Sequence, residues 1–305
     1  MARRGKPAEL NALIAVDKPC GMTSHDVVAR VRRAVGERRV GHAGTLDPMA
    51  SGVMVVGIGQ ATRLLGRLTL DTKSYVASIR FGWETNTDDA EGEPVREAPL
   101  PEGVADAEAA RCALEGFLGA GMQVPPAFSA ISVDGVRSYK RARDGESVEL
   151  PARPIEVLSA ELLAAGEGEW TAAFSVSKGT YIRALARDVG RAVGSAAHVS
   201  ALRRTASGSI SLADCLALDE VAPEAVRERA LDPLAALGVP AVGVGEAELA
   251  DIACGRAVRL SARLPAGAPL VGLVAADGLA ALARPEGGRL AMDTVFPQHV
   301  LGVRR

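Results

Sequence analysis

The sequence predicts an α/β protein with two domains, and three observations support this. The chain has 305 residues, about twice the length of a typical domain. Hydrophobic residues make up 48% of it and charged residues 24%, a composition typical of a globular protein with a sizeable core. Helical and strand-like patterns alternate up to about Val239, and short apolar runs separated by glycine follow. We therefore expect a larger α/β domain and a small β-rich C-terminal domain.

Local signals place the first elements along the chain. Thr23, with Asp26 three residues later, forms a capping-box signature that begins a helix, and Gly36 predicts its end. Tyr75 and Phe81 lie on the apolar face of an alternating segment, which is typical of a strand. After a polar tail at 1–10, the patterns predict a strand at 13–16, the helix that ends at Gly36, a glycine-punctuated loop at 41–52, a buried strand at 53–58, a helix at 60–70 and a strand at 73–81.

The middle of the chain contains an acidic stretch and a stretch rich in Pro, Ser and Arg. Turn residues in the acidic stretch, 84–108, predict an exposed loop, and the second stretch, 122–153, predicts a protruding loop or small insertion. Tyr181 and Arg183 fall in the first turn of a later helix. The remaining predicted elements are a helix at 105–118, strands at 155–162 and 170–176, the helix that contains 182–193, and a β-rich run at 271–282.

The net charge of −2 conceals an uneven distribution of charge. Residues 1–70 carry 11 basic and 5 acidic side chains, a net charge of +6, whereas residues 71–130 carry 4 and 11, a net charge of −7. The total is therefore a poor guide to whether the partner is a polyanion. Arginines of the first predicted helix, such as Arg30 and Arg33, lie off its apolar stripe, either as a solvated face or as a phosphate-contacting one.

Several kinds of site are absent from the sequence. The four cysteines lie far apart without a C-x-x-C pair, which predicts neither zinc nor a disulfide framework and fits a reducing cytoplasm. The four histidines lack metal-ligand spacing, and there is no dinucleotide fingerprint, phosphate-binding loop or G-x-S-x-G elbow. No apolar stretch approaches a membrane span of about 18 residues. An enzyme with this sequence is expected to use no metal or cofactor and to depend on a carboxylate.

Asp47 is the candidate carboxylate, because a residue before proline is held in extended geometry. Asp followed by Pro is also a common helix start, so this residue pair alone leaves both interpretations open. Arg183 adds a second signal. A cation in the first turn of a helix opposes the helix dipole, and a nearby carboxylate would offset that cost of about 0.3 to 1 kcal/mol. Asp47 is one candidate for that carboxylate.

Five stretches of the chain closely resemble the bacterial tRNA pseudouridine-55 synthase (TruB) family, in the family's order. The resemblance covers about residues 11–235 well and the C-terminal part weakly. The stretches are Val16-Asp17-Lys18-Pro19 with Gly21, Thr23 and Ser24; Gly41-His42-Ala43-Gly44-Thr45-Leu46-Asp47-Pro48 with Gly52; Gly82 with Thr85, Thr87, Asp89 and Gly92; Ser177-Lys178-Gly179-Thr180-Tyr181-Ile182-Arg183; and Ala197-His198 with Leu202-Arg203-Arg204.

The resemblance implies a pseudouridine synthase fold, with a mixed, mainly antiparallel sheet and flanking helices. It implies a catalytic domain at 11–238, within it an RNA-gripping insertion at 122–153, and a small PUA-like β-barrel at 239–305 that binds RNA. The implied protein is a cytoplasmic monomer that binds the T-arm of tRNA without metal or cofactor. It detaches the uridine of the T-loop from its ribose, turns it and rejoins it through carbon 5. Because the base must first leave its stack, the site needs a pocket with an aromatic face.

The resemblance also implies roles for individual residues. Asp47 matches the catalytic carboxylate, which either stabilises positive charge on the sugar or attacks covalently. Tyr75 matches a tyrosine that packs on the target base, and Arg183 matches an arginine that pairs with the catalytic carboxylate. The other matched residues are Tyr181 and Leu202 as substrate contacts, His42, which stacks in the RNA where the flipped base had been, and Lys18 and Pro19, which support the active-site loop.

Two positions depart from the family pattern. Phe128 stands where Tyr is usual and Ser132 where Lys is usual, which affects local RNA contacts and not the chemistry. An alternative from another class is a tRNA-binding or tRNA-folding chaperone that does not depend on isomerisation. The set of Asp47, Tyr75 and Arg183 argues against it, because a pure binder has no need for a carboxylate that faces phosphates.

Overall fold

The computed structural model describes residues 9–69, 72–129, 132–133, 136–137, 150–256, 258, 262–287 and 289–304. The chain forms two compact units. Unit 1 contains residues 1–48, 52–70 and 206–305, and unit 2 contains residues 49–51 and 71–205. Two strands, β3 (Ala50–Ile58) and β12 (Ala197–Ser207), contribute residues to both. Within the described ranges, no helix is both long and apolar enough to cross a membrane.

Unit 1 begins with a small mixed sheet built around strand β1 (Ala12–Lys18). This strand pairs antiparallel with β3 and parallel with β14 (Cys215–Ala217), and β2 (Val40–Ala43) pairs antiparallel with β3. Strands β1 and β3 are almost entirely buried, and the continuous apolar run at 53–58 predicts this burial for β3. The other elements here are α1 (Ser24–Val35), the 3-10 helix η1 (Gly59–Leu64), α2 (Leu65–Leu68), β13 (Ile210–Ser211), the 3-10 helix η2 (Leu212–Asp214), α6 (Pro223–Glu228) and α7 (Pro233–Leu237).

Local signals define helix α1, and its predicted boundaries are confirmed. The Thr23 hydroxyl accepts from the Asp26 backbone N–H at 3.1 Å, and the Asp26 carboxylate accepts from the Thr23 N–H at 2.9 Å. Gly36 ends the helix in the left-handed region, at φ 66°. The helix predicted at 60–70 is instead a 3-10 helix followed by one α-helical turn. The hydroxyl of Thr62 donates to the Gly59 carbonyl there, in competition with the α-helical pattern.

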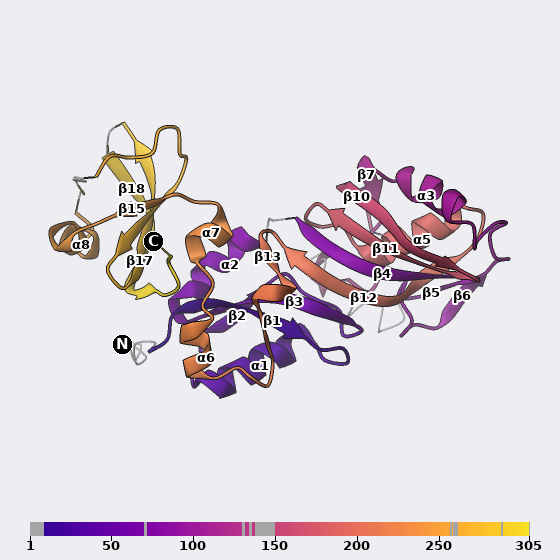
Figure 1. Cartoon of the computed structure of the whole chain (residues 1–305), viewed down its shortest axis with the longest axis horizontal. Helices are drawn as coiled ribbons and strands as arrows, with labels where there is room; N and C mark the ends of the chain where they lie inside the picture. The colour runs from indigo at the N-terminus through magenta and orange to yellow at the C-terminus, as the bar shows by residue number, and fades with distance from the viewer. Residues whose placement is uncertain are drawn as a thin grey trace. The chain divides into compact units, whose positions relative to one another are not determined.

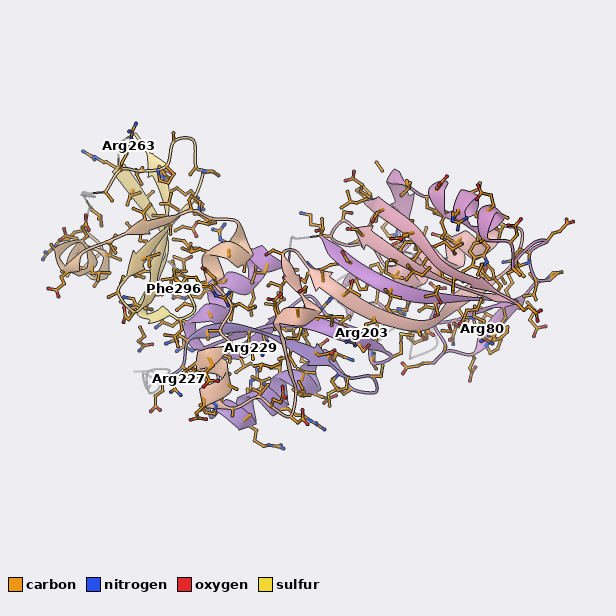
Figure 2. All side chains as sticks on the ribbon, viewed as in Figure 1. Arg80, Arg203, Arg227, Arg229, Arg263 and Phe296 are labelled. Carbon is orange, nitrogen blue, oxygen red and sulfur yellow. The ribbon has the colours of Figure 1, made fainter. Side chains whose placement is uncertain are left out.

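The C-terminal part of unit 1 contains a four-stranded sheet and helix α8 (Glu246–Ala253). Its strands, in order, are β15 (Ala241–Gly243), β16 (Val271–Ala275), β17 (Gly278–Glu286) and β18 (Arg289–Val300). One face shares a hydrophobic core with β1 and η1, in which Leu13, Leu64 and Phe296 are fully buried. Figure 2 labels Phe296, which belongs to β18. The sheet and the start of the chain therefore stabilise each other, and the domain boundary predicted near residue 239 stays a prediction.

Unit 2 contains a sheet with strand order β12, β4 (Lys73–Phe81), β11 (Glu169–Val176), β10 (Arg153–Gly166) and β7 (Gly119–Gln123). The last four strands pair antiparallel. Helices α3 (Ala107–Glu115) and α5 (Ile182–Ala192) pack beside each other against this sheet (Figure 1). Two short antiparallel strand pairs also belong to the described part, β5 (Trp83–Thr85) with β6 (Pro94–Glu97), and β8 (Ser132–Val133) with β9 (Val136–Arg137). The predicted mixed, mainly antiparallel sheet with flanking helices is confirmed.

The segment predicted as an insertion, 122–153, is described only in part. The end of β7, residues 124–129, the two short strands β8 and β9, and residues 150–153 belong to the described ranges. The side chain of Ser132 lies outside them, so the predicted effect of this departure from the family pattern stays a prediction. Phe128 is described, and its backbone oxygen accepts a hydrogen bond from Arg183.

The prediction of an exposed acidic loop at 84–108 is wrong for its first part. Glu84, Asp88 and Asp89 are buried, with relative exposures of 3%, 7% and 4%. They are buried because arginines of helix α5, about one hundred residues later in the chain, pair with them. Counting charged residues along the sequence does not reveal which of them pair in the folded chain.

Candidate active site

In unit 1, Asp47 lies in the loop between β2 and β3, and its neighbour on one side is fixed by Ser24. The Ser24 hydroxyl accepts from the backbone N–H of Leu46 at 2.9 Å and donates to the backbone oxygen of the same residue at 3.0 Å. Both Ser24 and Leu46 are buried. The half-buried side chain of Asp47 therefore projects from a backbone that is held immediately before it.

The residue after Asp47, Pro48, is held from the other side. Its backbone oxygen accepts from the Gly21 N–H at 2.9 Å and from Lys18 Nζ at 3.3 Å. Lys18 Nζ also donates to the Pro19 carbonyl at 2.9 Å, and the Lys18 side chain is fully buried. The loop is thus anchored on both sides of one carboxylate. This is the kind of rigid support that a reacting group requires.

His42 is the other predicted site residue of this loop region. It lies on β2 and is half-buried, and its ring meets the ring of His25 edge to face, with 5.9 Å between centroids.

In unit 2, Arg183 is the second residue of helix α5 and is only 4% exposed. Its Nη1 donates to the backbone oxygen of Thr87 at 2.6 Å and lies 3.3 Å from Asp89 Oδ2. Its Nη2 donates to the backbone oxygen of Phe128 at 3.0 Å. A buried cation near a helix N-terminus requires such partners. Asp89 is a partner of this cation to which the sequence assigned no role, although it belongs to one of the matched motifs.

The loop that carries Asp89 is tightly hydrogen-bonded. Asp89 Oδ1 accepts from the Thr87 hydroxyl at 2.6 Å and from the Glu91 N–H at 3.1 Å, and its backbone oxygen accepts from the Thr85 hydroxyl at 2.6 Å. A Cβ on Gly92 would overlap the Thr87 hydroxyl. Only glycine therefore fits where the loop closes.

Three arginines spaced four residues apart on α5 each pair with a buried carboxylate, and we call this set the arginine ladder. Residues at this spacing share one helix face, so the three pairs are consecutive rungs. The rungs are Arg183 with Asp89 at 3.3 Å, Arg187 with Asp88 at 2.8 Å, and Arg191 with Glu84 at 2.6 Å.

The pKa values of two carboxylates in the arginine ladder are shifted in opposite directions from their ordinary values. Burial raises the pKa of Asp88 to about 6, and the attraction of Arg187 only partly offsets it. Burial also acts to raise the pKa of Glu84. Hydrogen bonds from Arg191 and Arg96 outweigh it, and the pKa of Glu84 is lowered. The rung nearest the C-terminal end of α5 is thus strongly paired, whereas Asp88 is held ionised at a cost.

The remaining predicted site residues of unit 2 lie on three different elements. Tyr75 is half-buried on β4, opposite Phe174 of β11. Tyr181 is the N-cap of α5. Gln123 Oε1 accepts from the Tyr181 N–H at 2.9 Å, and Gln123 Nε2 donates to the Tyr181 backbone oxygen at 3.1 Å. Leu202 lies on β12 and is 7% exposed.

The predicted site residues divide between the two units. Lys18, Pro19, His42 and Asp47 belong to unit 1, whereas Tyr75, Tyr181, Arg183 and Leu202 belong to unit 2. The pairing of Asp47 with Arg183 joins residues of different units and stays a prediction.

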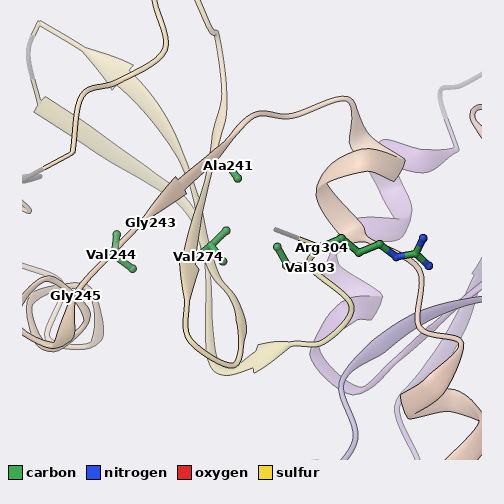
Figure 3. Close-up of a pocket in the computed structure, with 7 residues that line it drawn as sticks. All are labelled: Ala241, Gly243, Val244, Gly245, Val274, Val303 and Arg304. Atoms are coloured by element: carbon green, nitrogen blue, oxygen red, sulfur yellow. The ribbon is translucent and has the colours of Figure 1, made fainter.

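The described part of the chain contains no cluster of three or more His, Cys, Asp or Glu side chains suited to a metal ion. An open cavity of about 460 Å³ lies beside β15, lined mainly by glycine and valine (Figure 3). The guanidinium of Arg304 points away from Val244 and Val274 (Figure 3). The cavity brings no set of reactive groups together.

Comparisons with known proteins agree with one another. The family model described as TruB family pseudouridylate synthase (N terminal domain) matches residues 32–182, and that of the tRNA pseudouridylate synthase B C-terminal domain matches residues 183–237. A protein of Mycobacteroides abscessus named tRNA pseudouridine synthase B is 49% identical over 258 residues, which are 82% of this chain and 85% of the relative. A protein of Nocardia farcinica with the same name is 44% identical over 301 residues, 95% of this chain and 96% of the relative.

A solved structure supports the fold. The archaeal box H/ACA sRNP Nop10–Cbf5 complex contains a chain that is 24% identical, with a TM-score of 0.65, over 93% of this chain and 85% of that one. At this identity the match speaks for the fold alone.

Proposed function

The chain belongs to the TruB family of pseudouridylate synthases, and from this premise we propose that it converts uridine 55 in the T-loop of tRNA to pseudouridine. The observation that carries the proposal is the similarity, across 95% of the chain, to a relative named tRNA pseudouridine synthase B. The anchored Asp47 loop adds a physical argument, because the reaction needs a fixed carboxylate.

The reaction is an isomerisation that leaves the elemental composition of the nucleotide unchanged. The bond between N1 of uracil and C1′ of ribose breaks, and a bond from C5 of uracil to C1′ forms. The hydrogen on C5 leaves as a proton, and N1 gains one. Because nothing is oxidised or reduced overall, the balance requires no redox partner.

Asp47 is proposed as the carboxylate that carries the chemistry. Breaking the glycosidic bond develops positive charge on the sugar, which a carboxylate stabilises or captures in a covalent bond. Both roles need an ionised side chain held at one position. The hydrogen bonds to Leu46 and Pro48 support this, because they fix the backbone on either side of Asp47.

The other matched residues are proposed to hold the substrate. Tyr75 packs on the flipped base, Leu202 and Tyr181 line the pocket, and His42 fills the place that the base has left. Arg183 is proposed as the counter-ion of Asp47. Its burial and its backbone partners Thr87 and Phe128 support a fixed position for this cation.

The same proposal extends to how the protein binds tRNA. A monomer in the cytoplasm binds the T-arm through the catalytic domain, the insertion at 122–153 and the PUA-like domain at 239–305. Lys18 and Pro19 act by supporting the Asp47 loop. Because arginine and lysine contacts to phosphates release counterions, tRNA binding is expected to weaken as salt rises.

The test compares wild type with Asp47→Asn on a tRNA transcript that is tritiated at C5 of uridine, without added metal or nucleotide. Wild type is expected to release tritium and to place pseudouridine at position 55. The variant is expected to release none while it still binds tRNA. Asp277→Asn, which changes an exposed carboxylate of the same unit, serves as the matched control and is expected to match wild type. A wild type that binds tRNA without forming pseudouridine would favour the chaperone function instead.

A further inference from the structure

The middle rung of the arginine ladder joins three parts of unit 2. Arg187 Nη1 donates to Asp88 Oδ2 at 2.8 Å, and the two side chains are only 10% and 9% exposed. Arg187 Nη2 donates to the backbone oxygen of Val124 at 2.9 Å, and Nε donates to Asp188 at 3.0 Å. Arg187 therefore connects helix α5, the loop that contains Asp88, and the start of the 122–153 insertion.

Arg183, one helical turn before Arg187 on α5, contacts the same two segments. Arg183 donates to Thr87 in the loop and to Phe128, which lies four residues after Val124. The two arginines are thus consecutive rungs between the same pair of segments. Movement at the Arg187 rung changes the loop and, with it, the surroundings of Arg183.

Asp88 has two properties that cost free energy of folding. Its backbone lies in the left-handed region, at φ 59°, which Asp adopts more readily than most residues but still at a cost. Burial raises the pKa of its carboxyl to about 6, even though Arg187 and Arg183 attract the ionised form. The other charged groups that face it, Asp188 and Glu84, add repulsion. Residues held at such a cost are typical of functional sites.

We propose that Asp88 and Arg187 are positioning residues for pseudouridine formation. Asp88 holds the loop against Arg183, and Arg187 also holds the start of the insertion through Val124. This inference rests on the proposed function and deepens it. Loss of the contact with Asp88 disturbs Arg183 and lowers kcat, whereas loss of the contact with Val124 loosens an RNA-binding segment and raises KM.

Two variants separate these contacts. Asp88→Asn keeps the shape of the side chain and tolerates the left-handed backbone, so it removes only the charge. Arg187→Lys keeps the charge and with it the attraction to Asp88, but its single ammonium group cannot also hold Val124, which the second end of the guanidinium reaches. Glu108→Gln is the matched control, because it removes a carboxylate from an exposed ion pair on α3 of the same unit.

Each variant has its own expected kinetic signature on a T-arm substrate. For Asp88→Asn, kcat is expected to fall about tenfold with KM within about twofold of wild type. For Arg187→Lys, KM is expected to rise about tenfold with kcat within about threefold. The melting temperature of Asp88→Asn at neutral pH is expected to be no lower than that of wild type, because a costly buried charge is removed. Glu108→Gln is expected to match wild type in all three quantities.

The outcomes that overturn the inference are distinct from failure of the proposed function. Normal kcat and KM in both variants overturn it, and so does a lowered melting temperature accompanied by normal kinetics of the folded fraction. If wild type forms no pseudouridine, the proposed function fails, and amide hydrogen exchange then decides. Faster exchange at residues 85–92 in Asp88→Asn and at Val124, Ala127 and Phe128 in Arg187→Lys supports the positioning role. Unchanged exchange overturns it.

Discussion

Arg183 and Asp89 form a buried ion pair, with 3.3 Å between Nη1 and Oδ2 and with side chains that are 4% and 6% exposed. Arg183 lies near the N-terminus of α5, where the helix dipole disfavours a cation by about 0.3 to 1 kcal/mol. Asp89 offsets this cost, and the carbonyl groups of Thr87 and Phe128 satisfy further donors of the same guanidinium. The arginine is therefore held by partners on two sides.

Arg183→Lys is expected to lower pseudouridine formation by about 100-fold, because one ammonium group cannot serve partners that the planar guanidinium reaches from both of its ends. Tritium release from tRNA labelled at C5 measures the effect. Arg80→Lys, in a partly exposed pair with Glu169, is the control and is expected to retain activity. A near-normal rate for Arg183→Lys would remove the arginine from the proposed site.

Asp88 is expected to make stability fall as pH rises. Its pKa is about 6 in the folded protein against an ordinary value of 3.8, so the folded state binds the extra proton between these values. This contribution is present in full below the ordinary pKa and is lost as pH rises through about 6. The free energy of unfolding of Asp88→Asn, relative to wild type, should therefore increase by up to about 3 kcal/mol between about pH 4 and pH 7. Denaturant unfolding across this range measures it, and a constant difference would contradict the raised pKa.

Glu84→Gln is expected to have the opposite pH dependence. Hydrogen bonds from Arg191 and Arg96 outweigh burial and lower the pKa of Glu84, so its contribution to stability exists above the ordinary pKa and is lost at lower pH. At neutral pH the substitution should destabilise the fold by about 2 kcal/mol, since the three hydrogen bonds from Arg191 and Arg96 lose their charged acceptor. Chemical unfolding near neutral and at acidic pH tests this. A cost that is equal at both would count against the pairing.

Gly92→Ala is expected to distort the loop that carries Asp89. The added Cβ would overlap the Thr87 hydroxyl and the Asn86 side chain, at a cost of about 1 to 3 kcal/mol and with reduced activity. Gly121→Ala is the matched control, because a Cβ there meets no atom within 4 Å. The melting temperature and the rate of pseudouridine formation are the two measurements. Normal values for both in Gly92→Ala would show that the loop tolerates a side chain.

Phe296→Ala is expected to destabilise all of unit 1. Phe296 is fully buried in the core that the C-terminal sheet shares with β1 and η1, and its truncation should cost about 3 to 5 kcal/mol. Calorimetry should show one transition for this unit, moved to lower temperature. If the C-terminal sheet melts separately and the rest is unchanged, the shared core is not what stabilises the unit. Val95→Ala, at an exposed position, is the control.

Much of the local structure could be predicted from the sequence. Thr23, Asp26 and Gly36 define helix α1 through hydrogen bonds between residues close in the chain, and the alternation at 73–81 corresponds to β4. The candidate carboxylate Asp47 was also indicated by its neighbours, because Pro48 follows it directly and the residues around it resemble a family motif. These features depend on neighbours, which the order of residues contains directly.

Tertiary structure alone decided the surroundings of the site. Asp88 and Asp89 belong to a stretch that reads as a solvated acidic loop, yet both are buried against Arg187 and Arg183 of a distant helix. The sequence by itself determined the family, the candidate carboxylate and most of the elements. Only the folded chain determined which charges meet, because a charge is buried or exposed according to partners that lie far away in the sequence.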